Sequence, residues 1–252
     1  SAAAPQIVSL HLLNVATDAK VMTASTTNNL AGAPGVRAAY WNSMPVAALA
    51  LASVTNNAGV AVTNLSGDPM GAYFVRGNNN SGDNIATPGN TAARMFSGYQ
   101  DQFEGGVSAL NVTNIPFASY NVYCYVRPDQ GTSFRGGYLQ VTNNGAQKWI
   151  KGGTASGAPL PLPDNNGNGY VESGTSTQPA TFAQISAAHF ISFKGVTGAT
   201  LRVEMRAVGG GANGVSDGDG TRRLKVTGFQ IVEVPSSGTA TNLSLGSAIP
   251  SL

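Results

Sequence analysis

The chain has 252 residues, 42% of them hydrophobic, so it can bury a substantial core within a single β domain. Only 10% of residues are charged and the formal net charge is +2, without a run of Lys or Arg, which argues against nucleic-acid binding. The longest apolar run, at 45–52, is too short to span a bilayer, which takes about 20 residues, so membrane insertion is not expected.

Two features bear on the cellular compartment. The single cysteine, Cys124, cannot form an intramolecular disulfide. The opening "SAAAPQ" has neither a charged nor an apolar region and is typical of a mature terminus left after signal-peptide removal. With the low charge and the abundant Asn, Thr and Gly, this predicts a secreted, extracellular or cell-surface protein.

The first predicted strand lies near the N-terminus, where "QIVSLHLLNV" at 6–15 is apolar on both faces. It is either the first strand of its own sandwich or an arm donated to a neighbouring copy. We therefore divide the chain into a terminal strand or arm at 1–15, a sandwich domain at 16–234 and a tail at 235–252. The residues expected to make the assembly contact are Ile7, Val8, Leu10, Leu12 and Leu13.

Alternation of apolar and polar residues predicts most of the remaining strands. In 199–207, Leu201, Val203 and Met205 alternate with arginine and glutamate, as in a half-solvated antiparallel strand. The stretch at 119–127 carries apolar or large side chains on both faces, which indicates a central strand. The stretch at 223–234 changes phase at Gly228, which predicts a β-bulge.

Five further strands and one weak helix complete the prediction. With the N-terminal strand, expected at 6–14, the strands fall at 36–42, 58–65, 107–113, 136–143 and 188–194, separated by Asn- and Gly-rich turns. The helix is expected within 91–103, where Gly98 interrupts the pattern. About ten short strands predict an all-β, antiparallel β-sandwich with a jelly-roll arrangement.

Five stretches spread over 32–234 carry a family resemblance: "GAPGVRAAYWNSM", "MFSGYQDQF", "SYNVYCYVRPDQ", "HFISFKGVTGATLRVEM" and "LKVTGFQIVEV". Their strand cores and the Trp41-Asn42 pair resemble a loosely characterised β-sandwich family of secreted and surface-anchored bacterial proteins. The resemblance implies an exported, jelly-roll-like domain of a kind sometimes compared to carbohydrate-binding modules. It implies no catalytic residues.

The turn "PDNNGNGYVES" at 163–173 has part of the spacing of a calcium loop. Counted from its aspartate, oxygen ligands fall at positions 1, 3, 5, 7 and 9 with Gly at position 6, but the bidentate Glu of position 12 is replaced by Thr175. Calcium assisted by a second acidic turn and a metal-free Asx-rich turn both remain open. The candidate metal ligands are Asp164, Asn166, Asn168, Tyr170 through its backbone carbonyl, Glu172, Asp217 and Asp219.

One catalytic motif matches the sequence but lacks the secondary structure that its chemistry requires. "GVSDG" at 214–218 matches G-x-S-x-G, yet a turn and a strand follow it instead of the helix that a nucleophile elbow requires. His11 and His189 are the only histidines and lie in apolar surroundings, where packing is the expected role. Cys124 shares a face with two valines and is expected to be a buried apolar residue. We therefore expect that the chain has no enzymatic activity.

Aromatic residues offer the remaining binding chemistry, because an exposed ring can stack on the apolar face of a sugar. Tyr123, Tyr125 and Trp149 are the candidates for such a glycan platform, with burial in the core as the alternative.

Two functions therefore remain open. The first is a non-catalytic extracellular subunit that assembles with copies of itself into a filament, tube or layer, by donor-strand exchange and calcium-assisted contacts. The second is a carbohydrate-binding module of a larger secreted protein.

Overall fold

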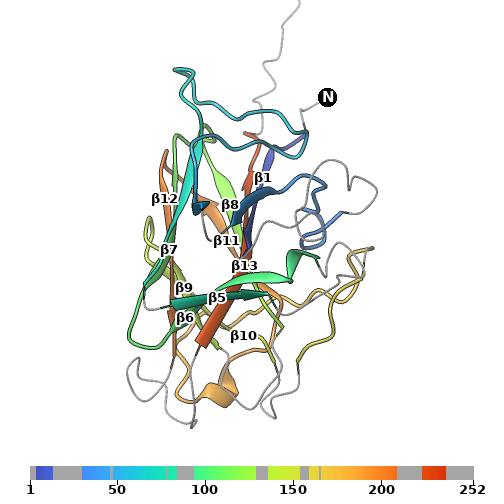
Figure 1. The fold of residues 1–252 in the computed structure, drawn as a ribbon, viewed down its shortest axis with the longest axis vertical. Helices are drawn as coiled ribbons and strands as arrows, with labels where there is room; N and C mark the ends of the chain where they lie inside the picture. The colour runs from blue at the N-terminus through green and yellow to red at the C-terminus, as the bar shows by residue number, and fades with distance from the viewer. Residues whose placement is uncertain are drawn as a thin grey trace, which may run out of the picture.

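The computed structural model describes residues 4–13, 30–45, 48–77, 79–83, 94–128, 136–153, 159–164, 166–208 and 223–236. These residues form an all-β sandwich of two mainly antiparallel sheets, which confirms the predicted fold class (Figure 1). No helix in this part of the chain has the length and apolar composition to cross a bilayer.

The first sheet has seven strands. It contains β11 (Phe190–Val196), β8 (Tyr120–Val126), β13 (Arg223–Glu233), β1 (Ile7–Leu13), β2 (Asn42–Pro45), β6 (Gly98–Phe103) and β5 (Asn79–Asp83). Strand β13 pairs along one side with β8 and along the other with β6 and then β1. Its pairing with β8 shifts register between Val226 and Gly228, so the predicted bulge is present.

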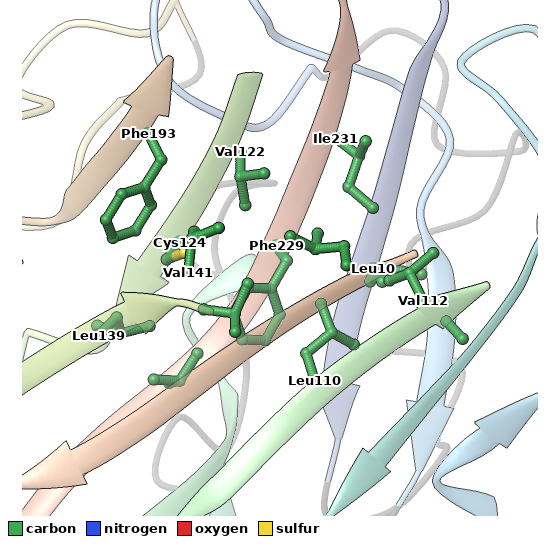
Figure 2. Packing of buried hydrophobic residues seen from close by; sticks show 14 of the residues in the cluster. Leu10, Leu110, Val112, Val122, Cys124, Leu139, Val141, Phe193, Phe229 and Ile231 are labelled. Carbon is green, nitrogen blue, oxygen red and sulfur yellow. The ribbon is translucent and has the colours of Figure 1, made fainter. Parts of the chain in front are cut away.

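The second sheet has six strands in the order β10 (Ala146–Lys151), β9 (Gly136–Val141), β12 (Leu201–Ala207), β7 (Ser108–Thr113), β4 (Gly71–Val75) and β3 (Ala50–Leu51). The predicted alternation of β12 is confirmed, because Leu201, Val203 and Met205 are buried while the residues between them are half-buried. The apolar side chains of both sheets meet in one core, shown in Figure 2 from Leu10 and Phe229 to Leu110 and Val141.

One side of the sandwich is closed by the segment at 171–175. The Ser173 amide donates to the carbonyl of Phe190 in β11 at 2.9 Å, and the Trp149 amide of β10 donates to the carbonyl of Thr175 at 2.8 Å. The segment therefore hydrogen-bonds to an edge strand of each sheet and satisfies backbone groups that would otherwise be free to pair with another chain.

Strand β1 lies inside the first sheet of its own chain. It pairs antiparallel with β13 and parallel with β2, and all seven of its residues are buried. The contacts expected to hold a neighbouring copy, from Ile7 to Leu13, are thus made within the chain, and donation of this strand requires it to leave both partners.

Two glycines allow the close approach of β1. A Cβ on Gly228 would lie 2.6 Å from the carbonyl oxygen of Leu10, and one on Gly98 would lie 2.6 Å from that of Leu12. Side chains at these positions would collide with backbone, so β1 and β6 can follow one another along β13 only because both positions are glycine.

Three local predictions were wrong in whole or in part. Of the helix expected within 91–103, residues 94 and 95 are helical, but β6 occupies 98–103, where pairing with β13 and β5 overrides helix propensity. The strand expected at 36–42 is mostly loop, and β2 begins only at Asn42. The stretch at 58–65 forms isolated bridges and turns instead of a strand.

We expect deletion of residues 1–14 to unfold the domain. Truncating one buried leucine to alanine costs about 2–5 kcal/mol, the deletion removes three leucines that are fully buried, and a typical domain is stable by only about 5–15 kcal/mol. Far-UV circular dichroism and thermal melting measure the effect. Deletion of residues 1–5, which precede β1, is the control and should leave the melt unchanged. A cooperative melt after the longer deletion would show that β1 is dispensable.

Candidate functional site

The outer face of the second sheet carries an ordered polar surface. It is built by side chains that alternate with the core residues of β12 and by their cross-strand neighbours on β4, β7 and β9, which share the same side of the sheet. We call this surface the arginine face and define it by Tyr73, Asn111, Gln140, Arg202, Glu204 and Arg206.

Glu204 lies at the centre of the arginine face between two arginines of its own strand. One carboxylate oxygen lies 3.0 Å from Nε of Arg202 and the other lies 3.0 Å from Nη2 of Arg206. Arg202 also donates to Oδ1 of Asn111 on β7 at 3.0 Å. The guanidinium groups are thereby held in place, although the two arginine side chains remain 40% and 36% exposed.

The charge of Glu204 is fixed by these contacts. Partial burial acts to raise its pKa, but hydrogen bonds from Arg206 and Arg202 outweigh burial and hold the pKa below its ordinary value. Glu204 is therefore ionised at neutral pH and neutralises one guanidinium, so the three groups together carry one net positive charge.

Tyr73 adds an apolar surface beside these charges. It lies opposite Asn111 in the register of β4 and β7, and it is 44% exposed. Amide, guanidinium and carboxylate groups beside an exposed aromatic ring can donate and accept hydrogen bonds with hydroxyl groups while the ring packs against C–H groups. Sequence analysis missed Tyr73, because one tyrosine in the short stretch "GAYFV" gives no signal that its ring is exposed.

The rings expected to form a glycan platform are buried. Two of them lie on the first sheet, and Trp149 lies on the outer side of the second sheet, two strands from Arg206. Tyr125 is fully buried on the outer face of the first sheet, where its hydroxyl donates to Oε1 of Gln230 and accepts from the Ala33 amide at 2.8 Å. Tyr123 is 8% exposed, and Nζ of Lys194 lies 4.2 Å from the centroid of its ring. Trp149 packs against Tyr138 with ring centroids 4.7 Å apart. None of the three offers the exposed ring that stacking on a sugar requires.

The predicted calcium loop is an Asx turn. Oδ1 of Asp164 accepts the amides of Asn166 at 2.8 Å and Asn168 at 2.9 Å, and Oδ2 accepts the side-chain amide of Asn168 at 2.9 Å. These bonds, led by that from the Asn168 side chain, hold the pKa of Asp164 below its ordinary value. The carboxylate is thus satisfied by its own loop.

The same turn occurs twice more in the chain. Oδ1 of Asn56 accepts the amides of Ala58 and Val60 at 3.0 and 3.1 Å, and Oδ1 of Asn64 accepts those of Ser66 and Asp68 at 2.9 Å each. In all three turns the fourth residue is glycine with a positive φ, between 75° and 84°. Neither copy has Gly at position 6 or a carboxylate at position 9, so the geometry at 164–168 requires only Asx and Gly.

The side chains of two other residues in the proposed site bond outside the loop. Tyr170 is expected to offer a metal its backbone carbonyl, and its hydroxyl accepts the Gly32 amide at 3.2 Å within the covering of the first sheet. The carboxylate of Glu172 accepts a hydrogen bond from Ser192 of β11. Asp217 and Asp219 lie outside the described residues. Within the described part of the chain, no group of three His, Cys, Asp or Glu side chains is placed to hold a metal.

Both histidines and the cysteine are buried, as expected for packing roles. His11 is fully enclosed, and burial lowers its pKa to about 4; the backbones of Met95 and Arg94 oppose the shift, but no described group meets either ring nitrogen in hydrogen-bonding geometry. Burial also lowers the pKa of His189, whose Nδ1 accepts the Val171 amide at 3.1 Å. Burial raises the pKa of Cys124, which keeps its thiol protonated.

No family model, curated protein or solved structure matches the chain in comparisons with known proteins. The family resemblance therefore stays an expectation from the sequence, and a function has to be inferred from the geometry of the chain itself.

The turn at 164–168 generates a prediction about calcium. We expect Asp164→Asn to preserve the melting temperature, because asparagine occupies the same position at 56 and 64, and Asp164→Ala to lower it by removing the accepting oxygens. We also expect added calcium to leave the wild-type melting temperature unchanged. A calcium-dependent rise that Asp164→Asn abolishes would instead establish a cation site in this loop.

Burial of His11 generates a prediction about acid. The folded pKa of about 4 lies below the ordinary value of 6.5, so the unfolded state binds more protons between these values and stability falls as the pH falls through that window. The loss should reach on the order of 3 kcal/mol. We expect His11→Leu to remove this part of the acid sensitivity, measured as the difference in urea unfolding free energy from wild type at pH 7 and at pH 4.5. Equal pH profiles of the two proteins would contradict the assigned burial effect.

Proposed function

We propose that this chain is a non-catalytic, exported carbohydrate-binding module, and that the arginine face holds the glycan. The proposal rests on the arrangement around Glu204. The guanidinium groups of two arginines are held there by ion pairs, and Asn111 and the exposed ring of Tyr73 lie beside them. A glycan presents hydroxyl groups in a plane and C–H groups on its ring faces, and this surface complements both.

The architecture supports a binding role for this face. The outer face of the first sheet is covered by an apolar cluster that includes Trp41, Phe96 and Tyr125, whereas β12 and β4 present Arg202, Arg206 and Tyr73 to solvent. Rigid strands hold these groups, so little conformational entropy is lost when a ligand binds. A jelly-roll order of the strands and export from the cell are parts of the same proposal.

Self-assembly is the second candidate function. It is favoured by Leu65, which is fully exposed at the tip of the turn at 64–68, and by Val60, which is 59% exposed in the neighbouring turn. Two apolar side chains on one projecting hairpin region offer a contact between copies. Sedimentation velocity at rising concentration distinguishes the candidates: assembly requires larger species that Leu65→Ser disperses, while a binding module sediments as a monomer.

Affinity electrophoresis on a broad panel of polysaccharides tests the glycan proposal. We expect at least one polysaccharide to retard the chain, and Tyr73→Ala and Arg202→Gln each to weaken that binding roughly tenfold, the equivalent of about 1.4 kcal/mol. Leu65→Ala is the matched control, because it truncates an exposed apolar side chain away from the arginine face, and it should bind like wild type. Unretarded migration in every polysaccharide would refute the proposed function, and retardation that both variants retain would place the site elsewhere.

A further inference from the structure

The charge of the arginine face narrows the class of ligand. Arg202 and Arg206 bring two positive charges and Glu204 one negative charge, and the carboxylate is shared between both guanidiniums. One positive charge is left over on a surface where both arginine side chains are at least about one third exposed. In a chain in which only 10% of residues are charged, such a concentration on one strand is complementary to an anionic ligand.

The guanidinium groups retain donors for that ligand. Arg202 uses Nε toward Glu204 and Nη1 toward Asn111, and Arg206 uses Nη2 toward Glu204. Each guanidinium has five N–H donors in a planar fork, so Nη2 of Arg202 and Nη1 of Arg206 keep theirs available. A planar carboxylate is the anion that such a fork matches.

The spacing of the two arginines favours a polymer. They are four residues apart on β12 and on the same side of it, which separates their Cα atoms by about 13 Å in an extended strand. The one position from which a single carboxylate contacts both guanidiniums is already occupied by Glu204, which repels a second anion placed there. A ligand carboxylate therefore meets the remaining donors of one arginine only. Two carboxylates carried by separate units of one chain satisfy both arginines, and the second contact then benefits from the first.

We propose that the arginine face binds an acidic polysaccharide of uronic acid units aligned along β12, with carboxylates at Arg202 and Arg206. This inference rests on the proposed carbohydrate-binding function and adds the requirement for charge. Tyr73 lies on β4, two strands from β12 with β7 between them, and packs against the polymer through its ring. It contributes equally to the affinity for the acidic and the neutral form.

The decisive comparison uses one polymer in two charge states. Polygalacturonate and its fully methyl-esterified form share backbone and linkage but differ in charge, and binding of the full chain to each is measured by affinity electrophoresis and calorimetry. We expect the acid form to bind at least tenfold more tightly than the ester, with an affinity that falls as NaCl rises. Polyglutamate of similar length is the control for simple charge attraction, and we expect it to bind at least tenfold more weakly than polygalacturonate.

Substitutions of the two arginines test whether the acidic polymer binds to them. Arg202→Gln and Arg206→Gln should each lower affinity for the acid form roughly tenfold, and Arg202→Lys should lower it by a smaller factor because charge is kept and the fork is lost. Lys194→Gln removes the same charge from β11 in the other sheet and should have no effect. Circular dichroism confirms that each variant is folded, and Arg202→Lys retains the pairing with Glu204 if Arg202→Gln is unstable.

Each contrary result has a distinct meaning. Equal or tighter binding of the ester overturns the requirement for uronate while leaving carbohydrate binding intact. Equal binding of polyglutamate reduces the interaction to charge attraction and overturns the inference. Acid-form binding that survives both glutamine variants places the anion elsewhere and also overturns it. No binding to either form overturns the inference; if the broad polysaccharide panel is negative as well, the proposed function fails with it.

Discussion

The pairing of β13 is the constraint on which the rest of the first sheet depends. Its eleven residues hydrogen-bond to β8 on one side and to two strands, β6 and β1, that follow one another on the other side. That arrangement needs backbone to approach backbone at Gly228 and Gly98, where any Cβ would lie 2.6 Å from a carbonyl oxygen. Because β1 is the N-terminal strand and β13 the last one, the sheet joins the two ends of the described chain, and neither strand can leave without exposing the core.

The two outer faces of the sandwich differ in what covers them. Loops reach over the first sheet and bury an aromatic cluster, and they are held by bonds such as that from the Gly32 amide to Tyr170 and from Arg37 to the Asn166 carbonyl (Figure 1). Burial there has a cost, because His11 must stay neutral without a hydrogen-bond partner among the described residues. On β12, by contrast, the outward residues are charged and solvated, and their order comes from pairing with one another and with Asn111. We therefore assign the proposed ligand to the second sheet.

The sequence predicts the strands in which apolar and polar residues alternate regularly. It does not predict a strand whose extended form depends on pairing with distant parts of the chain. Strand β12 is evident from its residues, and the bulge of β13 from Gly228. Strand β6 is not, because "MFSGYQDQF" gives only a weak helix signal and no regular alternation, and its extended part follows from pairing with β13 and β5. The spacing at 164–172 does not by itself distinguish a calcium loop from a metal-free turn, because Asx and Gly at similar intervals also form turns that bind their own amides, as the turns at 56 and 64 show. Burial of Tyr125 and exposure of Tyr73 depend on which loops cover which sheet, and no local pattern encodes that.

The arginine face combines rigidity with incomplete neutralisation, and both follow from where Glu204 lies. A carboxylate on one end of the array would pair with one arginine and leave the other free to rotate, whereas a central one holds both. Exposed ion pairs of this kind contribute little to folding, about 0–1 kcal/mol each. Their effect is instead on the unbound state of the surface, because side-chain freedom has already been lost before a ligand arrives. A triad of two arginines and one glutamate keeps one positive charge after this internal pairing, so the same contacts that order the surface also leave the charge that the proposed anionic ligand requires.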